Sequence, residues 1–277
     1  MRFVLYSIIG IIFSLAFFAC EEVVVLDISQ APPQLVIDGV VTNEDTVHIV
    51  RISRSGDFYG NRGTMVPDAI VEVMDDLGNT FNYTHNPEGY DSLQGWYFSD
   101  QPYAGREYGV YSLQVKVDSK IYVARDTLRP ITDIDSLSIR IDPSAIADPD
   151  SDGKVYQVLL YAREPQETTD FYYFKFYRDS VMEESNNIYI FDDKLLGSSL
   201  DGLPSPINFR EGEMASVEIY SLTREQFIYY SDLANILNSD GGMFSPPPAN
   251  PRTNISGGAL GFFQVSGINR ASLLVNP

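Results

Sequence analysis

Cysteine, histidine and tryptophan are scarce in this 277-residue chain, which has one cysteine, two histidines and one tryptophan. A lone cysteine cannot form an internal disulfide, so packing and hydrogen bonds must hold the fold. His48 and His85 lie neither in a metal-ligand spacing nor beside a nucleophile signature, and no serine stands in a Gly-x-Ser-x-Gly motif. The sequence therefore argues against cysteine, zinc and serine-triad catalysis.

Basic residues are also few, because 19 Lys and Arg stand against 38 Asp and Glu, giving a formal net charge of -19. Such an acidic chain is not expected to bind nucleic acid or an anionic membrane surface. Solubility outside the cell is the interpretation that we prefer. A glycosidase built on two carboxylates stays open, because the sequence does not show which acidic side chains converge.

The segment Met1–Glu22 has the layout of a secretory signal, with one positive charge at Arg2, an apolar run over Phe3–Phe18 and Ala19 before Cys20. This layout resembles a bacterial lipoprotein signal, in which the cysteine receives a diacylglycerol before cleavage. We therefore expect residues 1–19 to be a signal peptide and Cys20 to be the lipidation site. An ordinary signal peptide with a coincidental cysteine is the alternative.

The residues around the cysteine refine this expectation. Phe17 stands where the usual lipoprotein pattern has leucine, which is a departure from it. Glu21 and Glu22 resemble the acidic export signal of Bacteroidota lipoproteins, which directs them to the outer face of the outer membrane. We expect residues 20–33 to be a lipidated tether, with each buried acyl methylene contributing about 0.8 kcal/mol to anchoring.

Alternating apolar residues predict a mainly β fold for the remainder. Hydrophobic residues make up 44% of the chain and aromatic residues 13%, and this composition suits strands. The predicted N-terminal domain, residues 34–130, has seven short runs bounded by Gly, Asn, Asp or Pro, which is typical of a small antiparallel β-sandwich. The runs are residues 34–43, 45–55, 69–75, 80–84, 95–99, 108–117 and 120–128.

A second antiparallel, sandwich-like β-domain is predicted over residues 131–277, after a break in the alternation at residues 130–135. One short helix is expected near 223–238, because Thr223 and Gln226 form a capping-box pattern and apolar residues follow at helical spacing. The expected strands are residues 137–141, 155–162, 170–178, 187–191 and 215–222, with closing strands in 257–268.

An acidic loop offers a possible calcium site. Three carboxylates at alternate positions are followed by Gly153, and a backbone carbonyl comes next, as in the first half of a calcium-binding loop. Leu159 occupies the place of the expected bidentate glutamate, so an acidic turn between strands is the alternative. The candidate ligands are Asp148, Asp150, Asp152 and Lys154. No other cofactor is expected.

A pattern of Asp, hydroxyl residue and apolar residue occurs five times. It resembles the O-glycosylation acceptor of exported Bacteroidota proteins, and it supports the expected export. The candidate acceptors are Thr46, Ser92, Thr127, Ser136 and Ser180.

Aromatic residues on the outer faces of strands are candidates for stacking on sugar rings. Covering of these rings by a neighbouring domain or loop is the alternative. The candidates are Trp96, Tyr97, Tyr173 and Tyr177.

Beyond the lipoprotein start, five stretches spread along the chain are distinctive: LVIDGVVTNE, VPDAIVEVMDDLGNTF, GREYGVYSLQVKV, PITDIDSL and NILNSDGGMFSPPPANPRTNISGGALGFFQVSGI. Together they resemble the Bacteroidota family known as domain of unknown function 4249, over nearly the whole mature chain. The resemblance implies exported lipoproteins that are typically encoded near TonB-dependent outer-membrane transporters carrying a carboxypeptidase-like regulatory β-domain. It supplies no catalytic residues.

We therefore expect a non-enzymatic lipoprotein on the surface of the outer membrane, acting as accessory or binding partner of a TonB-dependent nutrient-uptake or envelope complex. Two alternatives remain open. One is a free-standing glycan-binding module that uses the aromatic surfaces, and the other is the carboxylate-based glycosidase.

Overall fold

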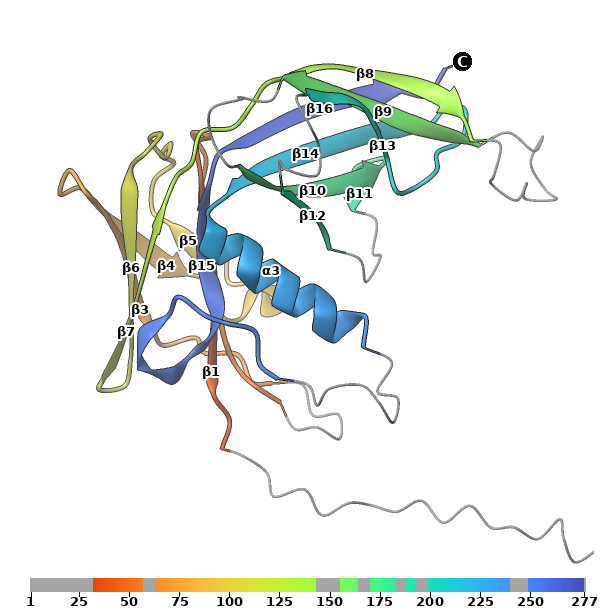
Figure 1. Ribbon diagram of the computed structural model, residues 1–277. Helices are drawn as coiled ribbons and strands as arrows, with labels where there is room; N and C mark the ends of the chain where they lie inside the picture. Colours follow the sequence, from red (N-terminus) through yellow and green to blue (C-terminus); the bar gives the residue numbers. More distant parts are fainter. Residues whose placement is uncertain are drawn as a thin grey trace, which may run out of the picture. The chain divides into compact units, whose positions relative to one another are not determined.

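The computed structural model (Figure 1) describes residues 32–56, 63–142, 155–163, 170–182, 188–192, 199–239 and 249–276. Most of these residues lie in strands, which confirms the prediction of a mainly β fold with several antiparallel sheets and one helix. Residues 33–277 form one compact unit. Within the described ranges, no helix combines the length and the apolar character needed to span a membrane.

The first sheet has eight strands in the order β15-β1-β2-β5-β4-β3-β6-β7. Neighbouring strands are antiparallel except for β1 and β15, which pair in parallel from Val36 opposite Leu260 to Thr42 opposite Ser266. The strands are β1 (Leu35–Thr42), β2 (Ile49–Arg54), β3 (Ile70–Asp75), β4 (Thr80–His85), β5 (Trp96–Ser99), β6 (Val110–Val117), β7 (Lys120–Thr127) and β15 (Leu260–Ser266), with single 3-10 turns at η1 (Asp91–Leu93) and η2 (Ser256–Gly258).

Alternation along these strands builds the first core, because successive side chains of a strand point to opposite faces. In β6, Tyr111, Leu113 and Val115 are at most 2% exposed, whereas Ser112 and Gln114 between them are half-buried. A fully buried apolar side chain of this size contributes about 1.5–3 kcal/mol to stability. Further members of the same cluster are Ile37, Val50, Ile52, Val73, Tyr97, Leu128 and Phe263.

The two edge strands of this sheet, β7 and β15, come together, so the sheet closes on itself along a seam. Arg129 and Ser266 form a parallel backbone bridge across the seam. Beside this bridge a side chain replaces the backbone as hydrogen-bond acceptor. The carboxylate of Asp126 accepts a hydrogen bond from the amide of Val265 at 2.9 Å. The hydroxyl of Ser256 in η2 accepts another from a β7 amide at 2.9 Å. These contacts satisfy strand-edge groups that would otherwise remain unpaired.

Two further sheets face each other in the second half of the chain. Their inner side chains share one core, of which Tyr172, Phe174, Leu200, Phe209 and Ile219 are at most 2% exposed. One sheet has the order β11-β10-β14-β16 with β12 also paired to β10, and the other has the order β13-β9-β8. The strands are β8 (Ile134–Ile141), β9 (Tyr156–Arg163), β10 (Phe171–Arg178), β11 (Val181–Met182), β12 (Tyr189–Asp192), β13 (Ser199–Pro204), β14 (Met214–Leu222) and β16 (Ile268–Leu274).

The chain passes from the first sheet to the second group of sheets at Gly267, the single residue between β15 and β16. The amide of Gly267 donates to the hydroxyl of Ser221 on β14 at 2.8 Å, and this hydroxyl donates to the carbonyl of Arg129 at 2.6 Å. The predicted division into residues 34–130 and 131–277 differs from this arrangement, because β15 pairs with β1. Hydrogen bonding between strands, and not order in the sequence, decides where β15 lies.

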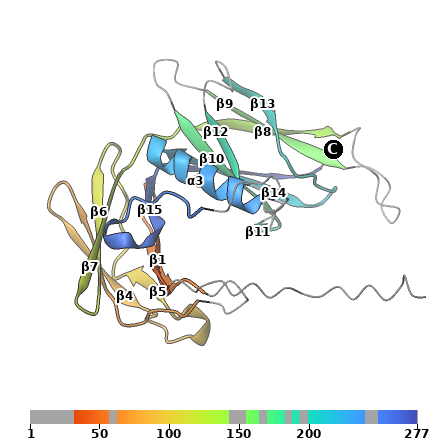
Figure 2. The ribbon, with the colours of Figure 1, turned by 60° about the horizontal axis from the view of Figure 1, so that its bottom comes forward.

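The helix α3 (Arg224–Leu237) begins where the capping box predicts. The amide of Gln226 donates to the hydroxyl of Thr223 at 3.3 Å, and the amide of Thr223 donates to the side-chain oxygen of Gln226 at 2.8 Å. Figures 1 and 2 show α3 alongside β10 and β14, and the rings of Phe227 and Tyr230 pack there against an apolar cluster. The helix thus covers part of the outer face of the β10–β14–β16 sheet.

Three strands of the second half differ from expectation. β11 and β13 fall outside the predicted runs, and β13 contains Gly202 at positive φ and ends at Pro204, so it lacks a clear alternation. β16 extends the predicted closing strands from Ile268 to Leu274, on the far side of Gly267.

Gly261 tests the close pairing of β1 with β15. Its φ is +90°, and a Cβ there would lie 2.2 Å from the carbonyl oxygen of Ile37. Gly258 has a φ of +80° with nothing within 4 Å of its added Cβ, so it is a matched control for backbone strain alone. We expect Gly258→Ala to lower the free energy of unfolding by about 1–2 kcal/mol, and Gly261→Ala to lower it clearly more, measured by urea denaturation. Equal losses would contradict the close pairing.

Candidate functional site

Several predicted site residues lie outside the described residues. They are the lipidation site Cys20, the export residues Glu21 and Glu22, and the candidate calcium ligands Asp148, Asp150, Asp152 and Lys154. Among the residues that the structure does describe, no group of three or more His, Cys, Asp or Glu could hold a metal ion.

The five candidate glycosylation sites are dispersed over the described residues. Thr46, Ser92, Ser136 and Ser180 are exposed, whereas Thr127 is half-buried at the end of β7. Their use as acceptors stays a prediction.

The four stacking candidates divide between the two halves of the chain. Tyr97 is completely buried, and its hydroxyl donates to the carbonyl of Val66 at 2.8 Å, so its assignment as a stacking residue was wrong. Its side chain lies on the inner face of β5, where it joins the first core. Trp96, its neighbour, lies on the outer face with the guanidinium of Arg51 at 5.6 Å from the ring centroid.

Tyr173 and Tyr177 both lie on the outer face of the β10–β14–β16 sheet, and there the register aligns charged and aromatic side chains. Lys175 on β10, Glu218 on β14 and Arg270 on β16 stand directly opposite one another. Tyr220 pairs with Tyr173 in the next row. We call the six residues Tyr173, Lys175, Tyr177, Glu218, Tyr220 and Arg270 the polar-aromatic face.

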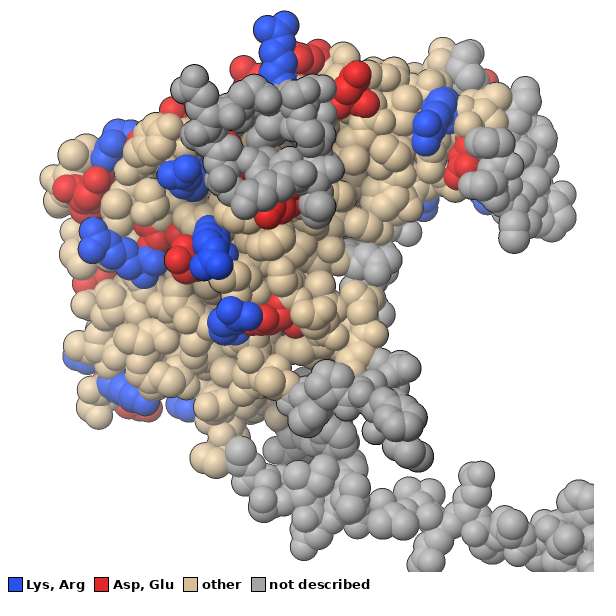
Figure 3. Space-filling view, in the orientation of Figure 1, with Lys and Arg blue, Asp and Glu red and all other residues tan. Residues whose placement is uncertain are grey.

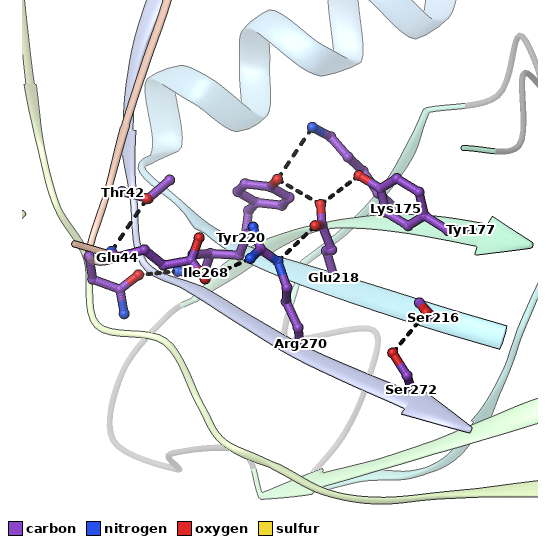
Figure 4. A network of polar contacts seen from close by, with 11 residues as sticks. Thr42, Glu44, Lys175, Tyr177, Ser216, Glu218, Tyr220, Ile268, Arg270 and Ser272 are labelled. Atoms are coloured by element: carbon purple, nitrogen blue, oxygen red, sulfur yellow. Dashed lines mark hydrogen bonds and ion pairs between the residues drawn. The ribbon is translucent and has the colours of Figure 1, made fainter. Parts of the chain in front are cut away.

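Glu218 is the centre of this face (Figure 4). Its Oε2 accepts hydrogen bonds from the hydroxyls of Tyr177 at 2.7 Å and Tyr220 at 2.8 Å, and its Oε1 accepts one from Nε of Arg270 at 2.8 Å. Burial acts to raise the pKa of Glu218. The hydrogen bonds of the two tyrosines and the positive charges of Arg270 and Lys175 outweigh burial and hold this pKa below its ordinary value. The carboxylate is therefore a stable anion.

Two positive side chains complete the face. The ammonium of Lys175 lies 4.6 Å from the ring centroid of Tyr220, and burial lowers the pKa of Lys175 despite the nearby carboxylate of Glu218. Arg270 is half-exposed and also reaches Glu44, which follows β1, with its Nη1 at 2.8 Å from Oε1 of Glu44. The face is thus linked by an ion pair to the turn between β1 and β2.

Tyr173 is less accessible than its alternation suggests. Its ring centroid lies 4.6 Å from that of Tyr230 in α3 and 5.9 Å from that of Tyr220. The ring of Tyr173 is therefore covered by the helix, which is the alternative to sugar stacking given above. Tyr177 lies on the same face and is half-buried.

A second feature is a pair of adjoining cavities beside the first turn of α3, which we call the α3 cleft. Their volumes are about 330 and 490 Å³, within the usual range of small-molecule sites. Both cavities are lined by Thr127, Thr223 and Glu225. The smaller also has Arg125 and Asp126 in its wall, together with Val110 and Asn254, and the larger has Arg129, Phe171, Leu222 and Arg224.

Asp126 in the wall of the smaller cavity is 8% exposed and has a perturbed ionisation. Burial raises its pKa to about 7, even though several donors act against burial, among them the amide of Val265 and the side chain of Gln226. Gln226 is itself completely buried, and its amide group donates to the carboxylate of Asp126 and to the carbonyl of Val265. Asp126 thus joins β7, β15 and α3.

Both histidines have structural partners. Nε2 of His48 lies 2.8 Å from the carbonyl oxygen of Tyr103, and burial lowers the pKa of His48. Nε2 of His85 accepts a hydrogen bond from the amide of Gly95 at 3.0 Å. These contacts hold the turns around β5.

The sequence contains signals for the polar-aromatic face and for the cluster around Asp126 that our prediction did not use. Lys175 interrupts an otherwise aromatic run, and Asp126 occupies a position that the alternation of β7 assigns to the buried face. A charge at such a position requires partners, and here they come from residues 223, 226 and 265. That distance along the sequence kept the cluster from being predicted.

Comparison with known families completes the description. The sequence profile of the family described as Domain of unknown function (DUF4249) matches residues 21–272. The chain belongs to this family. No curated protein matches this DUF4249 chain.

The charges of this DUF4249 protein are distributed without a dominant patch on the face that Figure 3 displays, where basic and acidic side chains alternate. Exposed ion pairs such as Arg252–Asp232 at 2.8 Å and Arg106–Asp76 at 2.7 Å also bring side chains of both signs together. Their exposure to solvent makes each pair worth little stability.

Replacing Asp126 by Asn tests its ionisation. The unfolded carboxyl ionises near its ordinary pKa of 3.8 and the folded one near 7, so the folded state binds the proton more tightly between these values. The free energy of unfolding of the wild type should therefore fall, relative to Asp126→Asn, as pH rises from 4 to 7, by up to about 4 kcal/mol. Denaturation curves of both proteins from pH 4 to 8 measure this difference. Parallel pH profiles would show that Asp126 has an ordinary pKa.

Proposed function

We propose that this DUF4249 protein is an exported lipoprotein, anchored through Cys20 and displayed on the outer membrane, that binds a partner without catalysing a reaction. The partner would be a TonB-dependent transporter or another component of a nutrient-uptake or envelope complex. The polar-aromatic face is the surface proposed for this contact.

The arrangement around Glu218 carries this proposal. Three donors fix its carboxylate, and tyrosine and arginine, which are enriched at the energetic centres of protein interfaces, surround it. Because the groups hold one another in place before binding, a partner would lose little side-chain entropy on contact with them. The half-exposed Arg270 presents an available edge of this network.

The two alternatives draw on specific residues as well. A glycan-binding module is supported by Tyr177 and by the hydroxyls of Ser216 and Ser272, which lie 2.8 Å apart in the same part of the sheet. A glycosidase would need two carboxyl groups across a cleft. Glu218 is a poor candidate for its general acid, because its pKa is lowered and a general acid needs a raised one.

The partner proposal predicts a site-specific loss of binding. Arg270→Gln removes a charge from the polar-aromatic face, and Arg163→Gln removes one from a side chain that is 91% exposed on β9. In co-purification from outer membranes solubilised in mild detergent, we expect Arg270→Gln to reduce the recovered transporter at least fivefold, about 1 kcal/mol, and Arg163→Gln to leave it unchanged. A wild-type protein that repeatedly elutes alone would speak against the proposal.

The anchor proposal predicts a change of compartment. Cys20→Ala removes the sulfur that would carry the lipid, so we expect the protein to leave the membrane fraction and to lose a metabolically incorporated fatty acid. Replacing Glu21 and Glu22 by Ala should keep the lipid but reduce accessibility to protease added outside intact cells. A Cys20→Ala protein that stays lipid-labelled in the membrane would contradict this assignment.

A further inference from the structure

The α3 cleft differs from the rest of the described surface because two of its arginines have no partner among the described residues. Most arginines within the described ranges have an acidic, aromatic or amide partner. Examples are Arg54 with Asp118, Arg106 with Asp76, Arg140 with Gln157, Arg252 with Asp232 and Arg270 with Glu218.

Arg125 and Arg224 are exceptions within the described ranges. Neither guanidinium has an ion pair, a side-chain hydrogen bond or a ring contact among the described residues. Arg125 lines the smaller cavity and Arg224 lines the larger one. The two cavities adjoin, because both are bounded by Thr127, Thr223 and Glu225. Two unengaged positive groups therefore border two neighbouring cavities that share the wall formed by Thr127, Thr223 and Glu225.

A third guanidinium and an aromatic wall add to the same cleft. Arg129 lines the larger cavity, with Nη2 at 4.0 Å from the carboxylate of Asp170 and its guanidinium carbon at 5.9 Å from the ring centroid of Tyr108. Phe171, the residue after Asp170, contributes a half-buried ring that also packs against Phe227 at 4.7 Å between centroids, and Thr127 lines the cavity as well. A guanidinium binds a carboxylate, and an aromatic ring packs against the apolar face of another ring.

The carboxylates that line the cleft form no ion pair with Arg125 or Arg224. Asp126 is already engaged by four donors, namely the amides of Thr127 and Val265 and the side chains of Thr223 and Gln226. Glu225 is exposed, and the carboxylate of Asp170 lies 4.0 Å from Arg129, so Arg125 and Arg224 are the two guanidinium groups of the cleft without an acidic partner among the described residues.

The cleft does not depend on the helix terminus itself. The hydroxyl of Thr223 and the side chain of Gln226 already satisfy the capping positions of α3 through the capping box. The attraction for an anion has to come from the guanidinium groups.

We propose that the α3 cleft binds an acidic oligosaccharide, with uronic acid carboxylates on Arg125 and Arg224 and a sugar ring against Phe171. Two arginines in adjoining cavities fit a ligand that carries carboxylates on separate rings. This site is distinct from the polar-aromatic face and does not depend on the function proposed for that face.

Calorimetric titration of the full-length lipoprotein in detergent with tri-galacturonic acid tests the proposal. Galactotriose serves as the neutral analogue, citrate as a carboxylate without a sugar ring, and inorganic phosphate as a simple anion. We expect tri-galacturonic acid to bind at least tenfold more tightly than the other three, with an affinity that falls as salt is added.

Substitutions separate the cleft from general charge effects. Arg125→Gln and Arg224→Gln should each weaken binding about tenfold, whereas Arg140→Gln, which removes an exposed charge on β8, should leave it unchanged. Arg270→Gln should also leave saccharide binding unchanged. The saccharide titration is therefore independent of whether the polar-aromatic face binds a partner.

Three results would overturn the proposal. They are the absence of tri-galacturonic acid binding, equal binding of citrate or phosphate, and equal weakening by Arg140→Gln. Because Arg125 and Arg224 are both exposed, their substitution is not expected to unfold the protein, and thermal denaturation of each variant verifies this.

Discussion

The fold depends on how the seam between β7 and β15 is closed. A sheet whose edge strands approach without full pairing leaves amide and carbonyl groups unsatisfied, and burying them would cost a few kcal/mol each. Asp126 supplies an acceptor to β15 at this place and is held by the side chain of Gln226 from α3. The seam, the helix N-terminus and the start of the second group of sheets therefore form one cooperative polar cluster.

This cluster explains why the two halves of the chain are not independent. β15 completes the first sheet, Gly267 follows, and β16 begins the edge of another sheet. Ser221 binds both Gly267 and the carbonyl of Arg129, and Glu44 reaches Arg270 from the opposite side. The polar-aromatic face is thus connected to the first sheet by short, specific contacts.

Local patterns in the sequence predict most of the strands and the helix, because alternation and capping act within a few residues. The observed limits of β1, β6, β7, β10, β14 and α3 agree with the predicted runs to within two residues at each end. The assignment of β15 to the first sheet was beyond reach, since its partner β1 lies more than 200 residues earlier. Tyr97 shows the complementary failure, because alternation finds the strand but does not by itself say which face is buried.

The residues of the candidate sites also divide into those that a local pattern can place and those that depend on contacts between distant segments. Tyr173 and Tyr177 could be placed on one face from β10 alone, whereas Glu218 and Arg270 meet them only through the register of three strands. Arg125 and Arg224 of the α3 cleft come from β7 and α3, which the sequence separates by almost 100 residues. No local signal connects them.

The position of β1 has a mechanical consequence. The chain enters the first sheet at Leu35, and β1 is hydrogen-bonded on one side to β2 and on the other to β15. A force applied to the preceding segment along the strand axis loads these two ladders in shear, so their bonds must break together and not one after another. A load on the segment before Leu35 would therefore be shared by both ladders, and β15 would pass its part through Gly267 to β16.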